Sequence, residues 1–402
     1  MPSITSLAND FVGILNNIDS DHEEANQAAN ALIGAAATAD PIARDDALSI
    51  VASALTNDSP VRGGMAAIVG GAIVENGGTA AMLARPLIAR LPDVLGLAAD
   101  FLAMVEEATP PRTDDEDDSE DEDDPGDGLT VYTEGRPVPR AISDPIAQEH
   151  RREASVFFNL SMWCLPTIAC LSTSADLRRE AATPELLSLC EVLEESGDNC
   201  GFLYTMLQVL DKEPLMVLHP ESRLGFECRM SGVSRNFQLH TLLADALIRD
   251  PEPSPVTKKP GLLGRLFGGS ASEPAPVPAG NWLTGPRPSP ALVAVVKGTG
   301  PQQIKEPSHG VWNLYNWRAL NAQGHLPDSA NKRETWIWNE GVPADIEKFE
   351  GTRVVLLGPE TYKRSWSSNR DFGLMKASVE VVRPLTAAEV DDWLRRMSAA
   401  AG

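Results

Sequence analysis

The sequence predicts a multidomain α+β protein with three folded parts. An N-terminal all-α helical bundle or HEAT-like stack comes first, then a mainly helical unit with a β-hairpin, then a small Trp-rich α+β domain. Three observations support this order. Residues 1–108 have an alanine-rich helical pattern, the apolar period changes inside residues 140–250, and six of the eight tryptophans fall within residues 291–402. Two stretches poor in large apolar residues, 109–139 and 251–290, separate the three parts.

Residues 1–108 carry the start and stop signals of several helices. These signals are Asp40-Pro41, Asp58-Ser59-Pro60 and Asn76-Gly77-Gly78. The pattern Ile-Val-x-x-Ala-Leu at 50–55 recurs 18 residues later as Ile-Val-x-x-Ala-Ile, which is typical of stacked antiparallel helices. Two copies are too few to choose a HEAT-like stack over a plain bundle. Glycine pairs at 63–64 and 70–71 predict that helix backbones approach closely at these positions.

The most acidic stretch of the chain is residues 114–124, in which ten of the eleven side chains are carboxylates. Such a run cannot bury itself, so it predicts a solvated, disordered linker over residues 109–139. The whole chain has a net charge of −23 and lacks the basic footprint that binds phosphate backbones. This charge disfavours nucleic acid and acidic membrane surfaces as partners.

Residues 140–250 change from a helical period to an alternating one and back. The predicted helices are 145–172, one that starts at Thr183-Pro184-Glu185, one that starts after Asp198-Asn199, and 236–248, whose stripe is Leu239, Leu242, Leu243, Ala246 and Leu247. The predicted strands are 215–218 and 226–230, joined by a turn at 219–223. The strands therefore form a β-hairpin within a mainly helical unit.

Residues 251–290 are predicted to be an extended spacer, because prolines recur in three P-x-P-x-P runs. Large apolar side chains interrupt the spacer in a short, positively charged segment. They are Leu262, Leu263, Leu266 and Phe267. Four apolar residues in a linker indicate a docking motif. It would dock on the folded parts of the chain, in a partner groove or on a membrane surface, although six residues are too short for membrane anchoring alone.

Residues 291–402 predict a compact α+β domain. The predicted strands are 291–297, 335–338, 353–357 and 376–383. A helix over 386–397 closes the domain, and Thr386 with Glu389 forms the capping-box pattern at its start.

A loop in this domain is the candidate ligand- or partner-binding site. It contains three cations around one aromatic ring in an otherwise acidic protein. The residues are Lys363, Arg364, Trp366 and Arg370. Trp and Arg side chains often anchor interfaces, so we expect the functional surface of the domain at this loop. Trp336 and Trp338 flank Ile337 on a predicted strand, which would place both rings on one face in the domain core.

Catalytic and metal-binding chemistry has weak support in the sequence. Cys200 lies near the start of a predicted helix, where the helix dipole favours a thiolate, and His219 and His240 are the nearest histidine bases in sequence. The five cysteines include no C-x-x-C pair, and Cys164 and Cys170 have no zinc-motif spacing. We therefore predict no catalytic residue, no metal site and no cofactor.

The leading functional hypothesis is a non-enzymatic, cytoplasmic protein-interaction or scaffold protein whose tethered modules bind an unidentified protein partner. One alternative is a thiol-dependent enzyme that uses Cys200 with His219 or His240. A second alternative is binding of single-stranded nucleic acid or a small ligand by the Trp-rich domain. The cytoplasmic assignment follows from an N-terminus without a basic signal-peptide region, and from a longest apolar stretch of 16 residues, whereas a bilayer span needs roughly 20.

Overall fold

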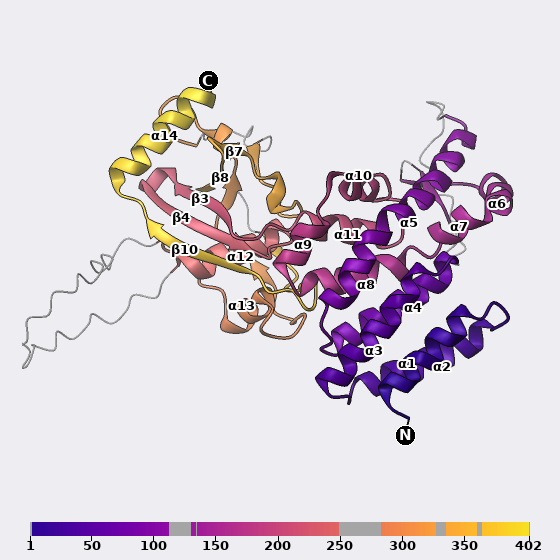
Figure 1. Cartoon of the computed structure of the whole chain (residues 1–402). Coiled ribbons are helices and arrows are strands. Elements are labelled where there is room, and N and C mark those ends of the chain that lie inside the picture. Colours follow the sequence, from indigo (N-terminus) through magenta and orange to yellow (C-terminus); the bar gives the residue numbers. More distant parts are fainter. Residues whose placement is uncertain are drawn as a thin grey trace, which may run out of the picture. The chain divides into compact units, whose positions relative to one another are not determined.

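The computed structural model describes residues 2–111, 130–133, 135–248, 283–326, 335–359 and 364–401 (Figure 1). The chain divides into two compact units. Unit 1 contains Met1–Val209 and Phe372–Met375, and unit 2 contains Leu210–Asp371 and Lys376–Gly402. The predicted α+β class is confirmed: N-terminal helices pack together, the middle of the chain is helical, and a mixed sheet with Trp-containing aromatic clusters follows.

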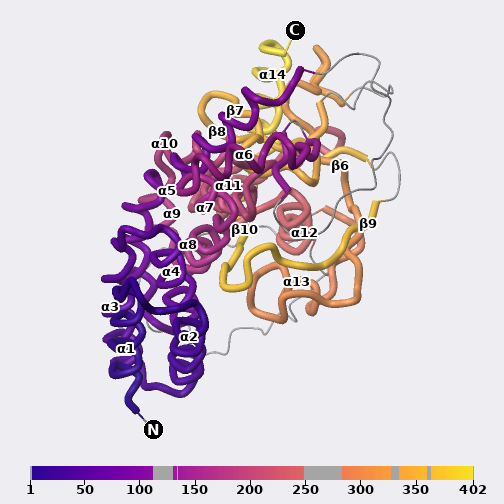
Figure 2. The backbone as a smooth tube through the Cα atoms, turned by 90° about the vertical axis from the view of Figure 1, so that its right-hand side faces the viewer, coloured from indigo at the N-terminus to yellow at the C-terminus, as the bar shows by residue number. Residues whose placement is uncertain are grey.

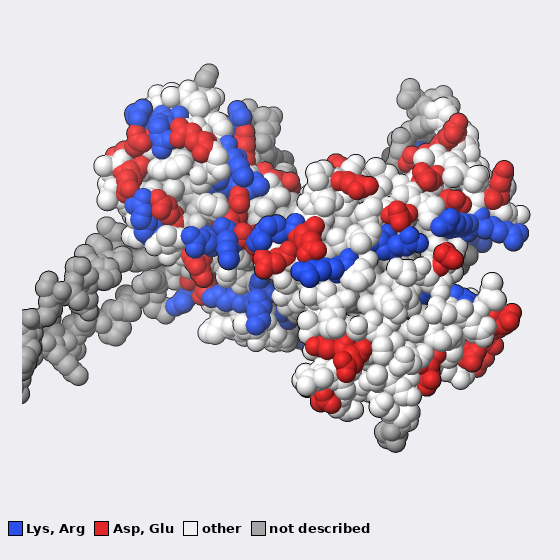
Figure 3. Space-filling view, viewed as in Figure 1, with Lys and Arg blue, Asp and Glu red and all other residues white. Residues whose placement is uncertain are grey.

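Unit 1 begins with five α-helices and one short 3-10 helix. They are α1 (Ile4–Asn16), α2 (His22–Ala36), α3 (Pro41–Ser53), η1 (Ala54–Thr56), α4 (Pro60–Glu75) and α5 (Ala81–Ala108). The predicted start at Asp40-Pro41 is confirmed, because the Asp40 side chain accepts a hydrogen bond from the Ala43 N–H and caps α3. Acidic side chains outnumber basic ones over α1–α3 on the face shown in Figure 3.

Glycines allow α4 to pack closely against a later helix of unit 1. A Cβ atom added at Gly71 would lie 2.8 Å from the Cβ of Pro166, and one added at Gly64 would lie 2.9 Å from the Cβ of Met162. Pro166 and Met162 belong to α8 (Ser161–Ser172). The predicted close approach of helix backbones at the glycine pairs is therefore confirmed.

Unit 1 continues with six further α-helices. They are α6 (Arg140–Glu149), α7 (Arg151–Phe157), α8, α9 (Ala175–Ala181), α10 (Pro184–Val192) and α11 (Cys200–Leu207). The single helix predicted over 145–172 is wrong. The chain leaves helical geometry at His150, with φ −107° and ψ 55°, and again before α8, where the Asn159 side chain donates to the Ser155 carbonyl over 2.8 Å. The start of α10 is confirmed, since Thr183 caps it.

Part of the stretch predicted as an acidic linker is ordered in unit 1. Strands β1 (Tyr132–Thr133) and β2 (Arg136–Pro137) form a small antiparallel pair. Val131 and Val138 are buried in the core of unit 1. The acidic run itself, residues 114–124, lies outside the described residues.

The described residues contain no single helix that is long and apolar enough to cross a membrane. Helices α7 and α8 pass the length and composition criteria together, as a pair bent by 43°.

Unit 2 is built on a mixed six-stranded sheet with the order β10-β4-β3-β8-β6, and with β7 paired to β8. The strands are β3 (Glu213–His219), β4 (Leu224–Ser231), β6 (Asn313–Tyr315), β7 (Lys348–Phe349), β8 (Thr352–Gly358) and β10 (Ser378–Pro384). The pairing of β3 with β8 is parallel, and the other pairings are antiparallel. The predicted β-hairpin is confirmed as β3 and β4, which are joined by η2 (Pro220–Ser222).

Side chains of β3 alternate between two cores on opposite faces of the sheet. Leu215 and Val217 belong to the core under α12 (Asn236–Leu247) and α13 (Pro290–Lys297). Met216 and Leu218 belong to the core under α14 (Ala387–Ala401) and η4 (Trp317–Ala319). Figure 1 shows α14 on one side of the sheet and α12 with α13 on the other. A separate two-stranded sheet joins β5 (Ser308–His309) to β9 (Ser365–Trp366), and η6 (Pro343–Asp345) precedes β7.

The Pro-rich stretch separates two parts of one sheet. Strands β3 and β4 precede it, whereas β6, β8 and β10 follow it, and all five share the sheet of unit 2. Ile248 and Leu283 form an isolated parallel bridge, so the described chain leaves unit 2 and re-enters it at neighbouring points. The division into units therefore falls at Val209 and Leu210, inside the range that the sequence assigns to one helical unit. The pairing of β3 and β4 with later strands joins residues far apart in the sequence, so no local sequence pattern predicts it.

Two of the strands predicted in the last part of the chain are wrong. Residues 290–297 form helix α13, because Ser289 caps the Leu292 N–H, Pro290 occupies the first turn and Gly298 ends the helix with φ 76°. These caps outweigh the β-branched residues in between. Residues 335–338 do not form a regular strand: Trp336 forms an isolated bridge with Tyr315, and the Ile337 N–H donates to Leu314 O over 2.9 Å.

Strands β8 and β10 confirm the predictions at 353–357 and 376–383, and α14 confirms the last helix. Its capping box is present, because the Thr386 N–H donates to Glu389 over 2.8 Å and the Glu389 N–H donates to the Thr386 hydroxyl over 3.3 Å.

Candidate functional site

The candidate site lies on a two-stranded ribbon, defined here as residues 302–310 and 364–371. Beyond the β5–β9 pair, three backbone hydrogen bonds hold the ribbon together. The Gly310 N–H donates to Arg364 O over 2.8 Å, the Ile304 N–H donates to Ser368 O over 3.1 Å, and the Arg370 N–H donates to Gln302 O over 3.0 Å. The predicted site loop is therefore one strand of an antiparallel pair.

Side chains alternate between the two faces of this strand. Ser365, Ser367 and Asn369 are exposed, whereas Trp366 is half-buried and Ser368 and Arg370 are buried. This period of two is typical of a strand with one covered face. Helices α12 and α13 cover that face, and Figure 2 shows both helices beside β9.

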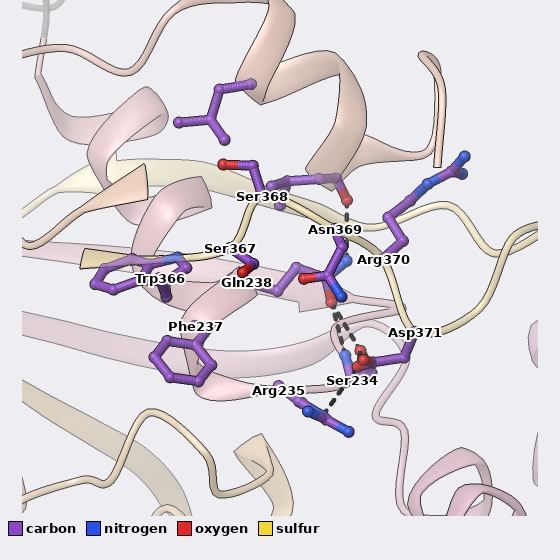
Figure 4. A pocket seen from close by; sticks show the side chains of 12 residues that line it. Ser234, Arg235, Phe237, Gln238, Trp366, Ser367, Ser368, Asn369, Arg370 and Asp371 are labelled. Carbon is purple, nitrogen blue, oxygen red and sulfur yellow. Dashed lines mark hydrogen bonds and ion pairs between the residues drawn. The ribbon is translucent and has the colours of Figure 1, made fainter. Parts of the chain in front are cut away.

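A small pocket, open to solvent, lies between the ribbon and the two helices (Figure 4). Its lining comes from three segments. They are the start of α12 (Ser234, Arg235, Phe237, Gln238), α13 (Leu292, Val296) and the ribbon (Trp366, Ser367, Ser368, Asn369, Arg370, Asp371). The site therefore combines aromatic, hydroxyl, amide and charged groups from parts of the chain that lie on both sides of the Pro-rich stretch.

Trp366 is fixed by two aromatic neighbours on α12. Its ring centroid lies 5.1 Å from that of Phe237 and 4.9 Å from that of His240, which meets the indole edge-on at 82°. Such tilted and edge-on pairs are the favoured arrangements of aromatic rings. The indole is thus held in one orientation beside the pocket.

His240 supports Trp366 from the interior as a neutral imidazole. The side chain is fully buried, and its Nε2 atom lies 3.0 Å from Trp312 O and 3.2 Å from Val311 N. Burial lowers its pKa to about 4, the hydrogen bond to Trp312 opposes this shift, and the charge of Arg364 adds to it. His240 is therefore a structural support behind the indole.

The charged floor of the pocket is internally neutralised. Asp371 Oδ2 accepts a hydrogen bond from the Ser234 hydroxyl over 2.8 Å and forms an ion pair with Arg235 Nε at 3.1 Å. Gln238 accepts from the Ser234 N–H over 2.8 Å and donates to Val296 O over 2.9 Å, which ties α12 to α13. These groups form a rigid polar wall.

Ser368 differs from its polar neighbours in the pocket. Its side chain is 2% exposed, and its hydroxyl has no hydrogen-bond partner among the described residues. Burying a hydroxyl without a partner costs about 1–3 kcal/mol. A hydrogen bond to a water molecule or to a ligand atom would offset this cost.

The structure brings together only part of the predicted site. Trp366 and Arg370 line the pocket, and Arg370 donates to Gly300 O over 3.1 Å. Arg364 lies on the ribbon with its guanidinium 4.8 Å from the centroid of the Trp336 ring. Lys363 lies outside the described residues, as do the docking-motif residues Leu262, Leu263, Leu266 and Phe267. Sequence reasoning missed the α12 residues, because no local signal joins them to the ribbon.

The expected burial of the neighbouring tryptophans is only half right. Trp336 is buried, but Trp338 is 56% exposed. The two rings meet edge-on with centroids 5.6 Å apart. Trp338 leaves the core because its carbonyl accepts from Asn236 Nδ2 over 2.8 Å and from the Gly341 N–H over 3.1 Å, which bends the chain into a turn.

The thiols do not form a recognisable active site. All five cysteines are free and buried, and Cys200 Sγ lies 3.6 Å from Cys164 Sγ in unit 1. The hydrogen bond to Cys200 and burial raise the pKa of Cys164 well above its ordinary value. Burial raises the pKa of Cys170, Cys190 and Cys228 to about 12. His219 and His240 belong to unit 2. Within the described ranges, no group of three His, Cys, Asp or Glu side chains is placed to hold a metal ion.

Comparison of the chain with protein-family models, curated proteins and solved structures finds no match.

Proposed function

We propose that the chain is a non-enzymatic, cytoplasmic interaction protein whose unit 2 binds a protein partner at the pocket between the ribbon and helices α12 and α13. The observation that carries the proposal is that one open pocket contains both Trp366, a half-buried indole, and the Ser368 hydroxyl, which has no hydrogen-bond partner within the described part of the chain. An aromatic anchor beside an unsatisfied polar group is typical of a recognition site.

The groups around the pocket favour binding over catalysis. A general acid or base must reach the substrate with a hydrogen bond. Asp371 is held by Ser234 and Arg235, and the imidazole of His240 is fully buried and bonded to the backbone of Trp312. A thiol-dependent reaction at Cys200 has little support, because its sulfur is buried against another thiol.

Two further parts of the proposal rest on composition. Five free cysteines favour a reducing compartment, hence the cytoplasm. Single-stranded nucleic acid is a weaker candidate for the same pocket, because the whole chain has a net charge of −23, which repels a long polyanion.

The test starts from a displayed library of random linear peptides selected on the purified full chain. Trp366→Ala should lower the affinity of the selected peptides by about tenfold or more, since interface anchors of this type cost at least 1–2 kcal/mol when truncated. The matched control is Trp393→Ala, because Trp393 is also half-buried in unit 2 but belongs to the core region under α14.

Melting curves of both variants are the control and should show that unit 2 remains folded. The proposal fails if the library yields no binder, or if Trp393→Ala weakens the selected peptides as much as Trp366→Ala does.

A further inference from the structure

Among the described residues, no strand pairs with the outer edge of β9. In an antiparallel pair, the backbone groups of successive residues point alternately toward the partner strand and away from it. The backbone groups of Arg364, Ser368 and Arg370 form hydrogen bonds with residues 302–310. The N–H and C=O of Ser365 and the N–H of Ser367 therefore point to the opposite edge, while Ser367 O accepts from the Asn369 N–H over 3.2 Å. Both serines are exposed.

This edge lacks the features that protect another exposed edge of unit 2. Strand β10 ends the six-stranded sheet, and it carries a bulge between Val381 and Arg383 and a proline at its end. Arg383 is also held by ion pairs with Glu227 and Glu389. Bulges, prolines and charges are how proteins prevent unwanted strand pairing at edges. Within the described part of this strand, the outer edge carries the exposed Ser365 and Ser367 and has no proline, so pairing there is allowed.

The charges around the ribbon favour an acidic occupant. The cationic side chains of this region are Lys305, Arg364, Arg370 and Arg235. The acidic ones are Glu306, which accepts a hydrogen bond from Ser289, and Asp371, which is paired with Arg235. A local positive excess in a chain of net charge −23 is a specific feature of this surface.

We propose that the partner presents an extended, net-acidic segment that adds to the outer edge of β9 as a third strand of the ribbon. This inference rests on the proposed function and names the partner chemistry of the same site. The segment accepts a hydrogen bond from the Ser367 N–H and exchanges hydrogen bonds with both backbone groups of Ser365. Its side chains alternate, and one of those that face α12 lies beside Trp366 and supplies a polar atom to the Ser368 hydroxyl.

The experiment uses synthetic peptides of the sequences selected on the full chain, with single N-methyl groups placed along the backbone. An N-methyl group removes one donor and blocks one edge of a strand. Methylation at one set of alternate residues should weaken binding by about tenfold per site, while the other set changes affinity by less than about threefold. Replacing Asp and Glu in the peptides by Asn and Gln should also weaken binding, and added salt should reduce that difference.

A protein variant gives an independent readout. Ser367→Pro removes one edge donor and should lower the affinity for the selected peptides. If Ser367→Pro lowers the melting temperature, the binding of the N-methylated peptides alone tests the inference. Peptides that depend on Trp366 yet tolerate methylation at every position would overturn the inference and leave the proposed function standing. Enrichment of basic peptides would also overturn it. Peptides that do not depend on Trp366 would overturn the proposed function first.

Discussion

Trp336 and Trp338 lie two residues apart, yet their side chains contribute differently to the stability of unit 2. Trp336 is 6% exposed, packs beside Tyr315 and lies under the Arg364 guanidinium, whereas Trp338 is 56% exposed and touches mainly the edge of Trp336. Burial, and not residue type, sets the cost of truncation.

We therefore expect Trp336→Ala to lower the free energy of unfolding of unit 2 by about 3–5 kcal/mol. Trp338→Ala should cost less than about 1.5 kcal/mol, as for an exposed side chain with one ring contact. Urea denaturation of the two variants measures the difference. Equal losses would mean that Trp338 belongs to the core, as an alternating strand would place it.

His240 gives unit 2 a defined pH dependence. Its folded-state pKa is about 4, below the ordinary value of about 6.5, because the ring is buried. The unfolded chain takes up a proton as the pH falls below about 6.5, and the folded chain does so only near 4, so stability is full above 6.5 and falls as the pH drops. The shift corresponds to a loss of about 3 kcal/mol between these values.

The measurement is the free energy of unfolding at several pH values for the wild type and for His240→Gln. The variant should be less stable at pH 7, and the difference in unfolding free energy between the two proteins should shrink toward pH 4. Both proteins contain the same carboxylates, so this difference reports the titration of His240 and not that of the carboxylates in the same pH range. A difference that stays constant with pH would show that His240 titrates normally in the folded state.

At the scale of the elements, glycine has opposite roles in two helices of unit 1. In α4, a Cβ at Gly71 would lie 2.8 Å from the Cβ and 2.9 Å from the Cα of Pro166, so backbone would have to move. In α2, a Cβ at Gly34 meets nothing within 4 Å. The lack of space, and not helix propensity, therefore decides whether alanine at position 71 stabilises or destabilises unit 1.

Gly71→Ala should destabilise unit 1 by about 1–3 kcal/mol, the usual cost of overpacking. Gly34→Ala should stabilise it by about 0.5–1 kcal/mol, because alanine loses less entropy in a helix. Thermal unfolding of the two single variants checks both signs. A stabilising Gly71→Ala would show that α4 and α8 are not in close contact.

Elements with complete local signals could be predicted from the sequence, and others could not. Helices α3, α10 and α14 begin at a capping side chain that stands next to proline or three residues before glutamate. Helix α13 has equally good caps in Ser289-Pro290 and Gly298, but its valines favour a strand prediction. Of the residues predicted to form a site, Trp366 and Arg370 line the pocket. Phe237 and Ser234 were not predicted, because only the folded sheet brings α12 to the ribbon.

At the scale of the whole molecule, unit 2 depends on pairing between distant parts of the chain. Leu215–Leu218 of β3 pair in parallel with Arg353–Leu356 of β8, and β10 pairs with β4. In the sheet order, β4 and β3 stand between β10 and β8. Residues 291–402 alone therefore lack the two central strands, and no local pattern in the sequence reports this.

This arrangement predicts how unit 2 responds to a break in the Pro-rich stretch. A specific protease site inserted within residues 251–290 of the full chain should be cut without separating the halves. The halves should stay associated because they share the backbone ladders β3–β8 and β4–β10 and a common core. Denaturing gels should show two fragments, and size-exclusion chromatography a single species of unchanged volume. Residues 291–402 produced alone should lack cooperative unfolding, since β10 then has no neighbour in the sheet. A folded, monomeric 291–402 fragment would contradict the observed strand order, and with it the placement of α12 beside the ribbon.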